Sequence, residues 1–205
     1  MNSERSFQLA FWLLLGLMML MRIWFAIRVS RAGERLMLDR AAIRREGWKI
    51  YAIRVFVFLL LVVLIVPLAR NPSRWRKLGF PLPFWLRWAG FALGLASLGL
   101  WTWTHVALGT LWSPQLQLRA NHRLVASGPY SRIRHPMYTA ILLWVMSLGF
   151  VIANWIPIIF AVGVAFLLLA RVPREEQMMR EQFGSEYREY MKRTGRFLPK
   201  WQGTP

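Results

Sequence analysis

Residues 127–138 read Ser127-Gly-Pro-Tyr-Ser-Arg-Ile-Arg-His-Pro-Met-Tyr138 and join a polar loop to a long apolar run. Proline is tolerated in the first turn of a helix, where its missing N–H costs nothing, and it disfavours helical geometry in the residue before it. The pair His135-Pro136 therefore predicts a helix that begins at Pro136. We expect His135 at the boundary of that helix, where it faces the edge between membrane and water.

The apolar run that follows, residues 137–170, is interrupted by Asn154-Trp-Ile-Pro157. It predicts a helical hairpin with arms of about 17 and 14 residues, and the second arm is short for a spanning helix, which needs roughly 20 residues. Two outcomes are open: the arms are tilted, or the second arm continues as helix past Arg171 in spite of Pro173.

Both ends of such a hairpin lie on the same side of the membrane. The entry carries His135 and Tyr138, and the exit carries Arg171 and Glu175. The hairpin is therefore expected to bring these four side chains close together.

Composition predicts an integral membrane protein. The 205 residues are 56% hydrophobic and include 12 Trp and 13 Phe, more apolar surface than a soluble domain of this size could bury. Apolar runs at 7–27, 50–69 and 84–108 precede the hairpin, so we expect an all-α polytopic fold with about five transmembrane helices. Gly90-x-x-x-Gly94 in the third run predicts close packing against another helix.

The basic residues predict how the chain is oriented. Loop 28–49 is strongly basic, which by the positive-inside rule makes it cytoplasmic and leaves the N-terminus outside. Linker 70–77 is also basic although this topology puts it outside, so its side stays an open question. Residues 174–193 are amphipathic and are expected to lie on the membrane or to pack over the polar loop. We divide the chain into N-terminal transmembrane helices (1–108) and a catalytic region (109–205).

The net charge of +18 comes from 27 Lys and Arg against 9 Asp and Glu. The charges cluster between apolar runs, where they orient the protein and meet lipid headgroups, so we expect membrane lipids and no nucleic acid as partners. No acidic residue lies between Gly47 and Arg174. A carboxylate that contacts a ligand at residues 127–138 must therefore come from elsewhere in the chain. The nearest candidates are in the C-terminal tail, by which we mean the residues from Arg174 onward.

Several kinds of chemistry fit the sequence poorly. With no Cys, and three His that have no acidic residue near them in the sequence, a metal site is not expected. A Gly-x-Ser-x-Gly nucleophile motif and a Gly-x-Gly phosphate turn are both absent. What remains is a membrane-edge pocket of Arg, Tyr and His, with Glu from the tail, which suits an amphiphilic anion and a zwitterionic or cationic cofactor.

Arg171 and Glu175 are four residues apart and share one face of a regular helix. They can pair with each other, or they can act on ligands. Arginine holds a carboxylate through two parallel hydrogen bonds, and glutamate accepts from an amine or a ribose hydroxyl.

In combination, the motifs resemble one known family, the isoprenylcysteine carboxyl methyltransferases of membranes. The resemblance covers roughly the C-terminal 90 residues, and the first three helices share only their apolar character with the family. The motifs are His122-x-Leu-Val125, Gly128-x-Tyr130, Arg134-His-Pro-x-Tyr138, Arg171-x-x-x-Glu175-Glu176, Phe183-Gly-x-x-Tyr187-x-x-Tyr190 and Thr194-Gly-x-Phe197.

The resemblance implies a membrane methyltransferase that uses S-adenosylmethionine without a Rossmann domain, with its active site facing the cytoplasm. It implies a lipophilic or lipid-modified substrate, in the family a prenylated C-terminal cysteine, and a monomer is compatible with it. Arg171 matches the position that holds the substrate carboxylate, and Arg134, Arg171 and Glu175 are the expected catalytic residues. The expected cofactor-binding residues are Gln115, His122, Arg123, Leu124, Val125, Tyr130, His135, Pro136, Met137, Tyr138 and Glu175.

Three other functions stay open from the sequence. A phospholipid N-methyltransferase would share the cofactor site but would have to remove a proton from an ammonium headgroup. A membrane reductase of the steroid-reductase type would bind NADPH instead. A non-catalytic membrane interaction protein would bind neither cofactor.

Overall fold

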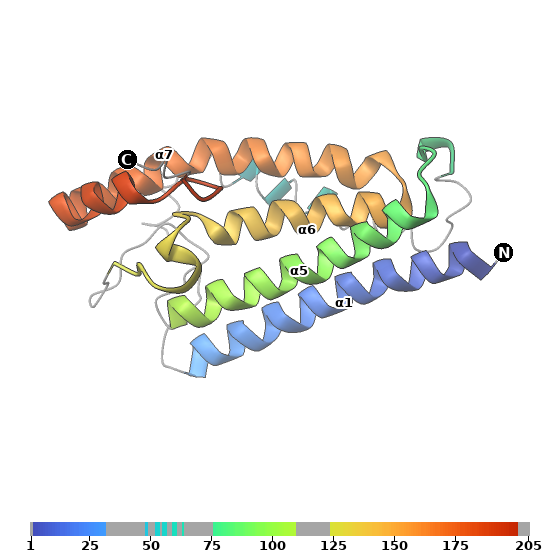
Figure 1. Cartoon of the computed structure of the whole chain (residues 1–205), viewed down its shortest axis with the longest axis horizontal. Coiled ribbons are helices and arrows are strands. Elements are labelled where there is room, and N and C mark those ends of the chain that lie inside the picture. The colour runs from blue at the N-terminus through green and yellow to red at the C-terminus, as the bar shows by residue number, and fades with distance from the viewer. Residues whose placement is uncertain are drawn as a thin grey trace.

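The computed structural model of the chain is an elongated arrangement of long helices (Figure 1). It describes residues 2–31, 76–109 and 124–200, together with scattered positions between 48 and 63. Within these residues the long helices are α1 (Asn2–Arg31), α5 (Phe84–Leu108), α6 (Pro136–Ile152) and α7 (Trp155–Arg193), and the short 3-10 helices are η1 (Arg76–Leu78) and η3 (Gly128–Ser131).

The predicted all-α class is confirmed for the described residues. Helices α1, α5 and α7 are long and apolar enough to cross a membrane, and α6 is a shorter apolar helix of 17 residues. By their length and composition, these helices make the chain an integral membrane protein. Most of the predicted span at 50–69 lies outside the described residues, so the structure leaves that part of the helix count untested.

The predicted hairpin is present as α6 and α7. Helix α6 ends at Ile152, Ala153 adopts a left-handed conformation (φ 48°), and the Asn154 side chain caps α7 by accepting a hydrogen bond of 3.0 Å from the N–H of Ile156. The two helices can approach closely at the turn because Gly149 has no side chain where Ile158 packs. The start of α6 and the far part of α7 consequently lie at the same end of the molecule (Figure 1).

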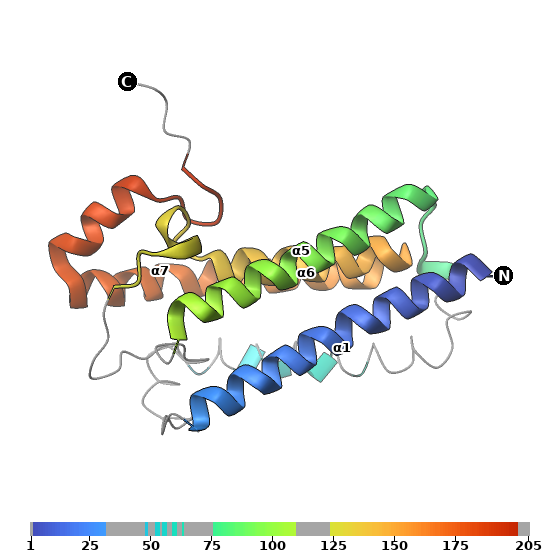
Figure 2. The ribbon, with the colours of Figure 1, turned by 60° about the horizontal axis from the view of Figure 1, so that its bottom comes forward.

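Helix α7 extends beyond the predicted second arm and includes the amphipathic tail. It has 39 residues, continues through Pro173 and bends at Gly184, whose backbone angles (φ 52°, ψ −117°) are outside the helical region. Residues with a side chain rarely adopt a positive φ, so glycine is needed at this bend. Beyond it the chain folds back toward η3 and the start of α6 (Figure 2).

Two glycines of α5 account for its close packing, as the Gly-x-x-x-Gly spacing predicted. A Cβ added at Gly90 would lie 2.6 Å from the Cβ of Phe150 on α6. One added at Gly94 would lie 2.6 Å from Leu14 on α1 and 2.8 Å from Ser147 on α6. Helix α5 therefore packs against both neighbours through positions where only glycine fits.

We expect Gly90→Ala to lower the thermal stability of the detergent-solubilised protein. Overpacking of this kind costs roughly 1–3 kcal/mol, because Phe150 must shift together with the backbone that carries it. Gly99→Ala is the matched control: it lies on the same helix, and an added Cβ there meets no atom within 4 Å. Equal unfolding temperatures for the two variants would contradict this account of the packing.

The end of the bundle that carries the α6–α7 turn is held together by Arg87 on α5. Its Nη1 lies 2.6 Å from the Glu4 carboxylate on α1, its Nε donates to the Val151 carbonyl on α6 at 2.9 Å, and its guanidinium stacks 3.7 Å from the Phe7 ring centroid. A buried cation in an apolar bundle needs such partners. One side chain thus connects three helices.

The described end of linker 70–77 lies near the same turn. The N–H of Phe80 donates to the Ala153 carbonyl at 3.0 Å, and Gly79 forms a bridge with Asn154. Residues 127–138 lie at the opposite end of the helices (Figure 1). Residues 79 and 80, which follow the linker, and residues 127–138 therefore lie at opposite ends of the helices.

Candidate functional site

The site begins with the turn Ser127-Gly128-Pro129, which leads into η3. Gly128 has a positive φ of 58°, and a Cβ there would lie 3.1 Å from the indole nitrogen of Trp103 on α5. The N–H of Tyr130 donates to the Ser127 carbonyl at 3.1 Å, which closes the turn. The turn therefore packs on α5 and buries Tyr130.

The tail closes directly over the segment that precedes α6. The N–H of Gly195 donates to the Arg132 carbonyl at 3.0 Å, and the N–H groups of Arg134 and His135 donate to the carbonyls of Gly195 and Arg196 at 2.8 and 3.0 Å. The tail therefore packs against the end of the polar loop, which is one of the two outcomes expected from the sequence.

Two side-chain hydrogen bonds secure this closure on either side of the paired backbones. The hydroxyl of Tyr190 donates to the Tyr130 carbonyl at 2.7 Å. The hydroxyl of Thr139 donates to the Phe197 carbonyl at 2.7 Å. The tail is thus tied both to η3 and to the first turn of α6.

At the centre of the closure lies Glu176 of α7, whose side chain is 1% exposed. Its Oε1 accepts from Arg134 Nε at 3.0 Å and from Arg196 Nε at 3.2 Å, and its Oε2 accepts from Arg196 Nη2 at 2.6 Å. The Nε2 of His135 lies 3.3 Å from Oε1. One buried carboxylate therefore joins α7, the start of α6 and the end of the tail.

Arg134 also donates hydrogen bonds to the carbonyl groups at the end of α7. Its Nη1 donates to the carbonyl of Met191 at 3.2 Å and to the carbonyl of Thr194. The last carbonyls of a helix have no partner within the helix, and a cation there also opposes the helix dipole. Arg134 therefore connects Glu176 to the C-terminal end of α7 and helps to hold the tail in place.

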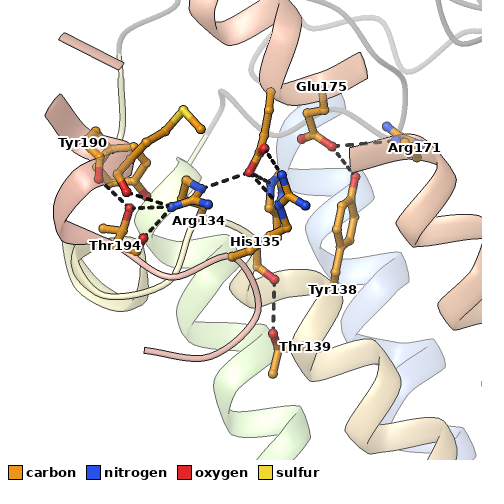
Figure 3. Close-up of polar contacts among 11 residues, drawn as sticks. Arg134, His135, Tyr138, Thr139, Arg171, Glu175, Tyr190 and Thr194 are labelled. Carbon is orange, nitrogen blue, oxygen red and sulfur yellow. Dashed lines mark hydrogen bonds and ion pairs between the residues drawn. The ribbon is translucent and has the colours of Figure 1, made fainter. Parts of the chain in front are cut away.

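Next to this cluster is the predicted constellation of Tyr138, Arg171 and Glu175 (Figure 3). The Tyr138 hydroxyl donates to Glu175 Oε2 at 2.6 Å, and Arg171 Nε lies 3.9 Å from the same oxygen. The rings of His135 and Tyr138 are parallel, with centroids 5.4 Å apart and an interplanar angle of 2°. The expectation that the tail supplies the carboxylates for residues 127–138 is confirmed.

Among the described residues, the site has an excess of positive charge. Three guanidinium groups, from Arg134, Arg171 and Arg196, lie around two carboxylates, from Glu175 and Glu176. The hydrogen bond to Glu176 raises the pKa of Arg196 above its usual value, so this positive charge persists.

Tyr130 lies outside the spanning helices and keeps its proton. Burial, followed by the charge of Glu175 and the nearby Tyr190, raises the pKa of Tyr130 well above its ordinary value. Its phenol is therefore a neutral hydrogen-bond donor at any physiological pH.

Of the residues selected from the sequence, the structure brings together Arg134, His135, Tyr138, Arg171 and Glu175. Pro136 begins α6 with His135 as its N-cap, as predicted, and Met137 packs against the core of the bundle. Leu124 and Val125 are half-buried in the segment before η3. Gln115, His122 and Arg123 lie outside the described residues.

Sequence reasoning missed the contributions of Glu176, Thr194 and Arg196. Glu176 was recorded only as part of a motif, yet it has more charged partners than Glu175. One feature of the sequence could have identified Glu176. It stands next to Glu175, and no other acidic residue occurs in the more than one hundred positions before this pair.

The fold and the site define a class of protein: an integral membrane helical protein with a charged, partly buried site at one end, closed by its own C-terminal tail. The isoprenylcysteine carboxyl methyltransferase (ICMT) family matches residues 91–181. The resemblance inferred from the motifs is thereby confirmed for this region, which contains α6 and most of the site.

Two curated relatives show how far the similarity extends. The uncharacterized protein YpbQ of Bacillus subtilis is 24% identical over 176 residues, which cover 83% of this chain and 97% of YpbQ. Protein-S-isoprenylcysteine O-methyltransferase B of Arabidopsis thaliana is 34% identical over 86 residues, which cover 42% of this chain and 44% of the plant protein.

Among solved structures, the eukaryotic intramembrane Ras methyltransferase ICMT has the same fold over much of its length. The match has a TM-score of 0.53 at 17% identity and covers 82% of this chain and 56% of that protein. The chain thus spans about half the length of the methyltransferases that it matches.

Proposed function

We propose that the chain is an integral-membrane methyltransferase that transfers a methyl group from S-adenosylmethionine to a membrane-embedded carboxylate, that of a prenylated cysteine or a similar lipophilic acid. The observation that carries the proposal is the α6–α7 hairpin, which brings Arg171 and Glu175 of α7 beside Tyr138 and His135 at the start of α6. The match of residues 91–181 to the methyltransferase family supports it.

The residues of the site fit S-adenosylmethionine, which carries an amine, a carboxylate and ribose hydroxyls. Tyr138 and Arg171 both contact Oε2 of Glu175, so within the described part of the chain Oε1 is available to accept from an amine or a hydroxyl. We assign cofactor binding to Tyr130, His135, Tyr138 and Glu175, with Gln115, His122, Arg123, Leu124, Val125, Pro136 and Met137 as the further residues proposed from the sequence.

Arg171 is proposed to hold the acceptor carboxylate. Its side chain is 12% exposed. Arg171 precedes Glu175 by one helical turn and therefore lies closer to the apolar part of α7. A guanidinium grips a carboxylate through two hydrogen bonds and thereby fixes its direction. A lipophilic substrate that enters from the bilayer would meet this residue before it meets Glu175.

The reaction requires no general base on the chain, because a carboxylate is already ionised at neutral pH. When bound, S-adenosylmethionine supplies an electrophilic methyl group on a sulfonium. The task of the protein is to align the carboxylate and to exclude water, and positioning alone contributes roughly 7–11 kcal/mol in favourable cases. The tail, tied to residues 132–135 and to Thr139, covers the site and provides this exclusion.

We further propose that the site faces the cytoplasm. Exposed basic residues gather at the site end of the helices, among them Arg28 and Arg31 at the end of α1 and Arg132, Arg174 and Arg180 around the site. An excess of basic residues next to spanning helices is typical of cytoplasmic ends. The soluble methyl donor would then reach the site directly.

The proposal is tested by incubating the purified protein in lipid nanodiscs with radiolabelled S-adenosylmethionine and a farnesylcysteine analogue. Label in a base-labile ester on the analogue is the expected result. Label on phosphatidylethanolamine instead would identify a phospholipid N-methyltransferase. Binding of NADPH without binding of S-adenosylmethionine would overturn the proposal.

A further inference from the structure

The two consecutive glutamates of α7 each hold one of two parallel rings at the start of α6. Glu175 accepts from the hydroxyl of Tyr138 at 2.6 Å, and Glu176 contacts Nε2 of His135 at 3.3 Å. The two rings lie parallel, with an interplanar angle of 2°. Figure 3 shows the contact of Glu175 with Tyr138, beside the ring of His135.

We propose that Glu176 is a positioning residue, which fixes the orientation of the His135 ring and the nitrogen that carries its proton. The proposal rests on the proposed function in one respect, since His135 is there assigned to cofactor binding. It goes further because it gives Glu176 a task that acts through His135.

The chemistry of the contact determines the tautomer. An ionised carboxylate only accepts hydrogen bonds, so the proton of His135 that faces Glu176 must be on Nε2. In a neutral ring Nδ1 then has a lone pair and is an acceptor. His135 is 6% exposed and Glu176 is 1% exposed, so water competes little for this hydrogen bond.

The surroundings keep Glu176 ionised and fixed in place. Arg134 and Arg196 contact the same carboxylate, and Arg196 does so through both oxygens. Stabilisation of the charged form by two guanidinium groups favours the carboxylate over the acid. Glu176 thus has a fixed geometry from which it can direct the His135 ring.

A purely structural role for Glu176 would be limited to holding the tail. In that case its loss and the loss of another bond that holds the tail, that of the Tyr190 hydroxyl to the Tyr130 carbonyl, should have the same consequences. A positioning role adds one consequence that removal of the Tyr190 hydroxyl does not share, namely a change at the His135 ring.

The test uses the full chain in detergent micelles, labelled with ¹⁵N in histidine. The chain has three His, so the signals of His135 are assigned by comparison with His135→Gln. In the wild type we expect a protonated Nε2 and an unprotonated Nδ1. In Glu176→Gln the proton should redistribute between the two nitrogens, because a neutral amide holds it less firmly than a carboxylate does.

Tyr190→Phe is the matched control, because it removes the 2.7 Å hydrogen bond from the tail to the Tyr130 carbonyl and leaves the partners of Glu176 in place. It should loosen the tail and leave the His135 signals as in the wild type. Glu176→Asp serves if Glu176→Gln does not fold: it keeps the charge for both arginines but moves the carboxylate away from His135. Unchanged His135 signals in whichever Glu176 variant folds would overturn the proposal.

The dissociation constant for S-adenosylmethionine gives a second readout. It should rise about tenfold in Glu176→Gln, the lower end of what is lost when the partner that orients a metal-binding histidine is removed. It should stay near the wild-type value in Tyr190→Phe. If the wild type does not bind S-adenosylmethionine at all, the proposed function fails, and the ¹⁵N signals still decide whether Glu176 positions His135.

Discussion

Replacement of Arg171 by alanine is expected to abolish methyl transfer while the affinity for S-adenosylmethionine is retained. The variant removes the proposed partner of the acceptor carboxylate. Loss of one member of a buried, hydrogen-bonded charge pair costs roughly 2–5 kcal/mol, so kcat/KM should fall by about 30-fold to a few thousandfold. The cofactor site should survive, because Glu175 keeps its 2.6 Å hydrogen bond from Tyr138.

The measurement compares kcat/KM for a farnesylcysteine analogue with the dissociation constant for S-adenosylmethionine. Arg180→Ala is the control, because Arg180 lies on the same helix with an exposed side chain. Its kinetics should match those of the wild type. If Arg171→Ala loses turnover and cofactor affinity to the same extent, Arg171 serves the cofactor or the fold and not the acceptor.

The sequence predicted the parts of the fold that depend on local rules. The start of α6 at Pro136 follows from proline geometry, and the packing of α5 follows from the spacing of Gly90 and Gly94. The place of the tail was predicted from a charge argument: residues 127–138 have basic groups, and the nearest carboxylates are in the tail. Each of these inferences needs only short sequence distances or a simple count of charges.

The course of α7 was harder to predict, because Pro173 ordinarily ends or bends a helix and Gly184 is a weaker signal. In the structure the helix continues through Pro173 and turns at Gly184. Proline is tolerated in membrane helices where neighbouring groups or local adjustment satisfy the backbone. The turn, in contrast, requires a positive φ, which glycine provides.

The sequence also could not show which of the two glutamates, Glu175 or Glu176, is buried. Neighbours on a helix point about 100° apart, and which one is buried depends on how the helix is rotated against α6. The structure buries Glu176 completely and leaves the side chain of Glu175 28% exposed. The more exposed glutamate is thus the one placed to meet a ligand, and the buried one holds the surrounding residues.

Replacement of Arg134 by alanine is expected to destabilise the whole closure of the tail. Glu176 would lose one buried partner, and the carbonyls of Met191 and Thr194 would lose their donor. Breaking a buried ion pair from one side costs roughly 3–5 kcal/mol. At about 2–4 °C per kcal/mol for a chain of this size, the unfolding temperature should fall by about 10 °C.

The experiment follows tryptophan fluorescence during heating and the rate at which trypsin cleaves the tail. Arg132→Ala is the control, because its side chain is exposed two positions away. Arg134→Lys should fall between wild type and Arg134→Ala, since an ammonium cannot reproduce the planar fork that reaches Glu176 and the helix end together. An Arg134→Ala protein that is as stable and as protease-resistant as the wild type but inactive would contradict a role of Arg134 in holding the tail. That result would instead support the catalytic role that the sequence suggested for Arg134, because the only remaining task for its charge would be at the reacting groups.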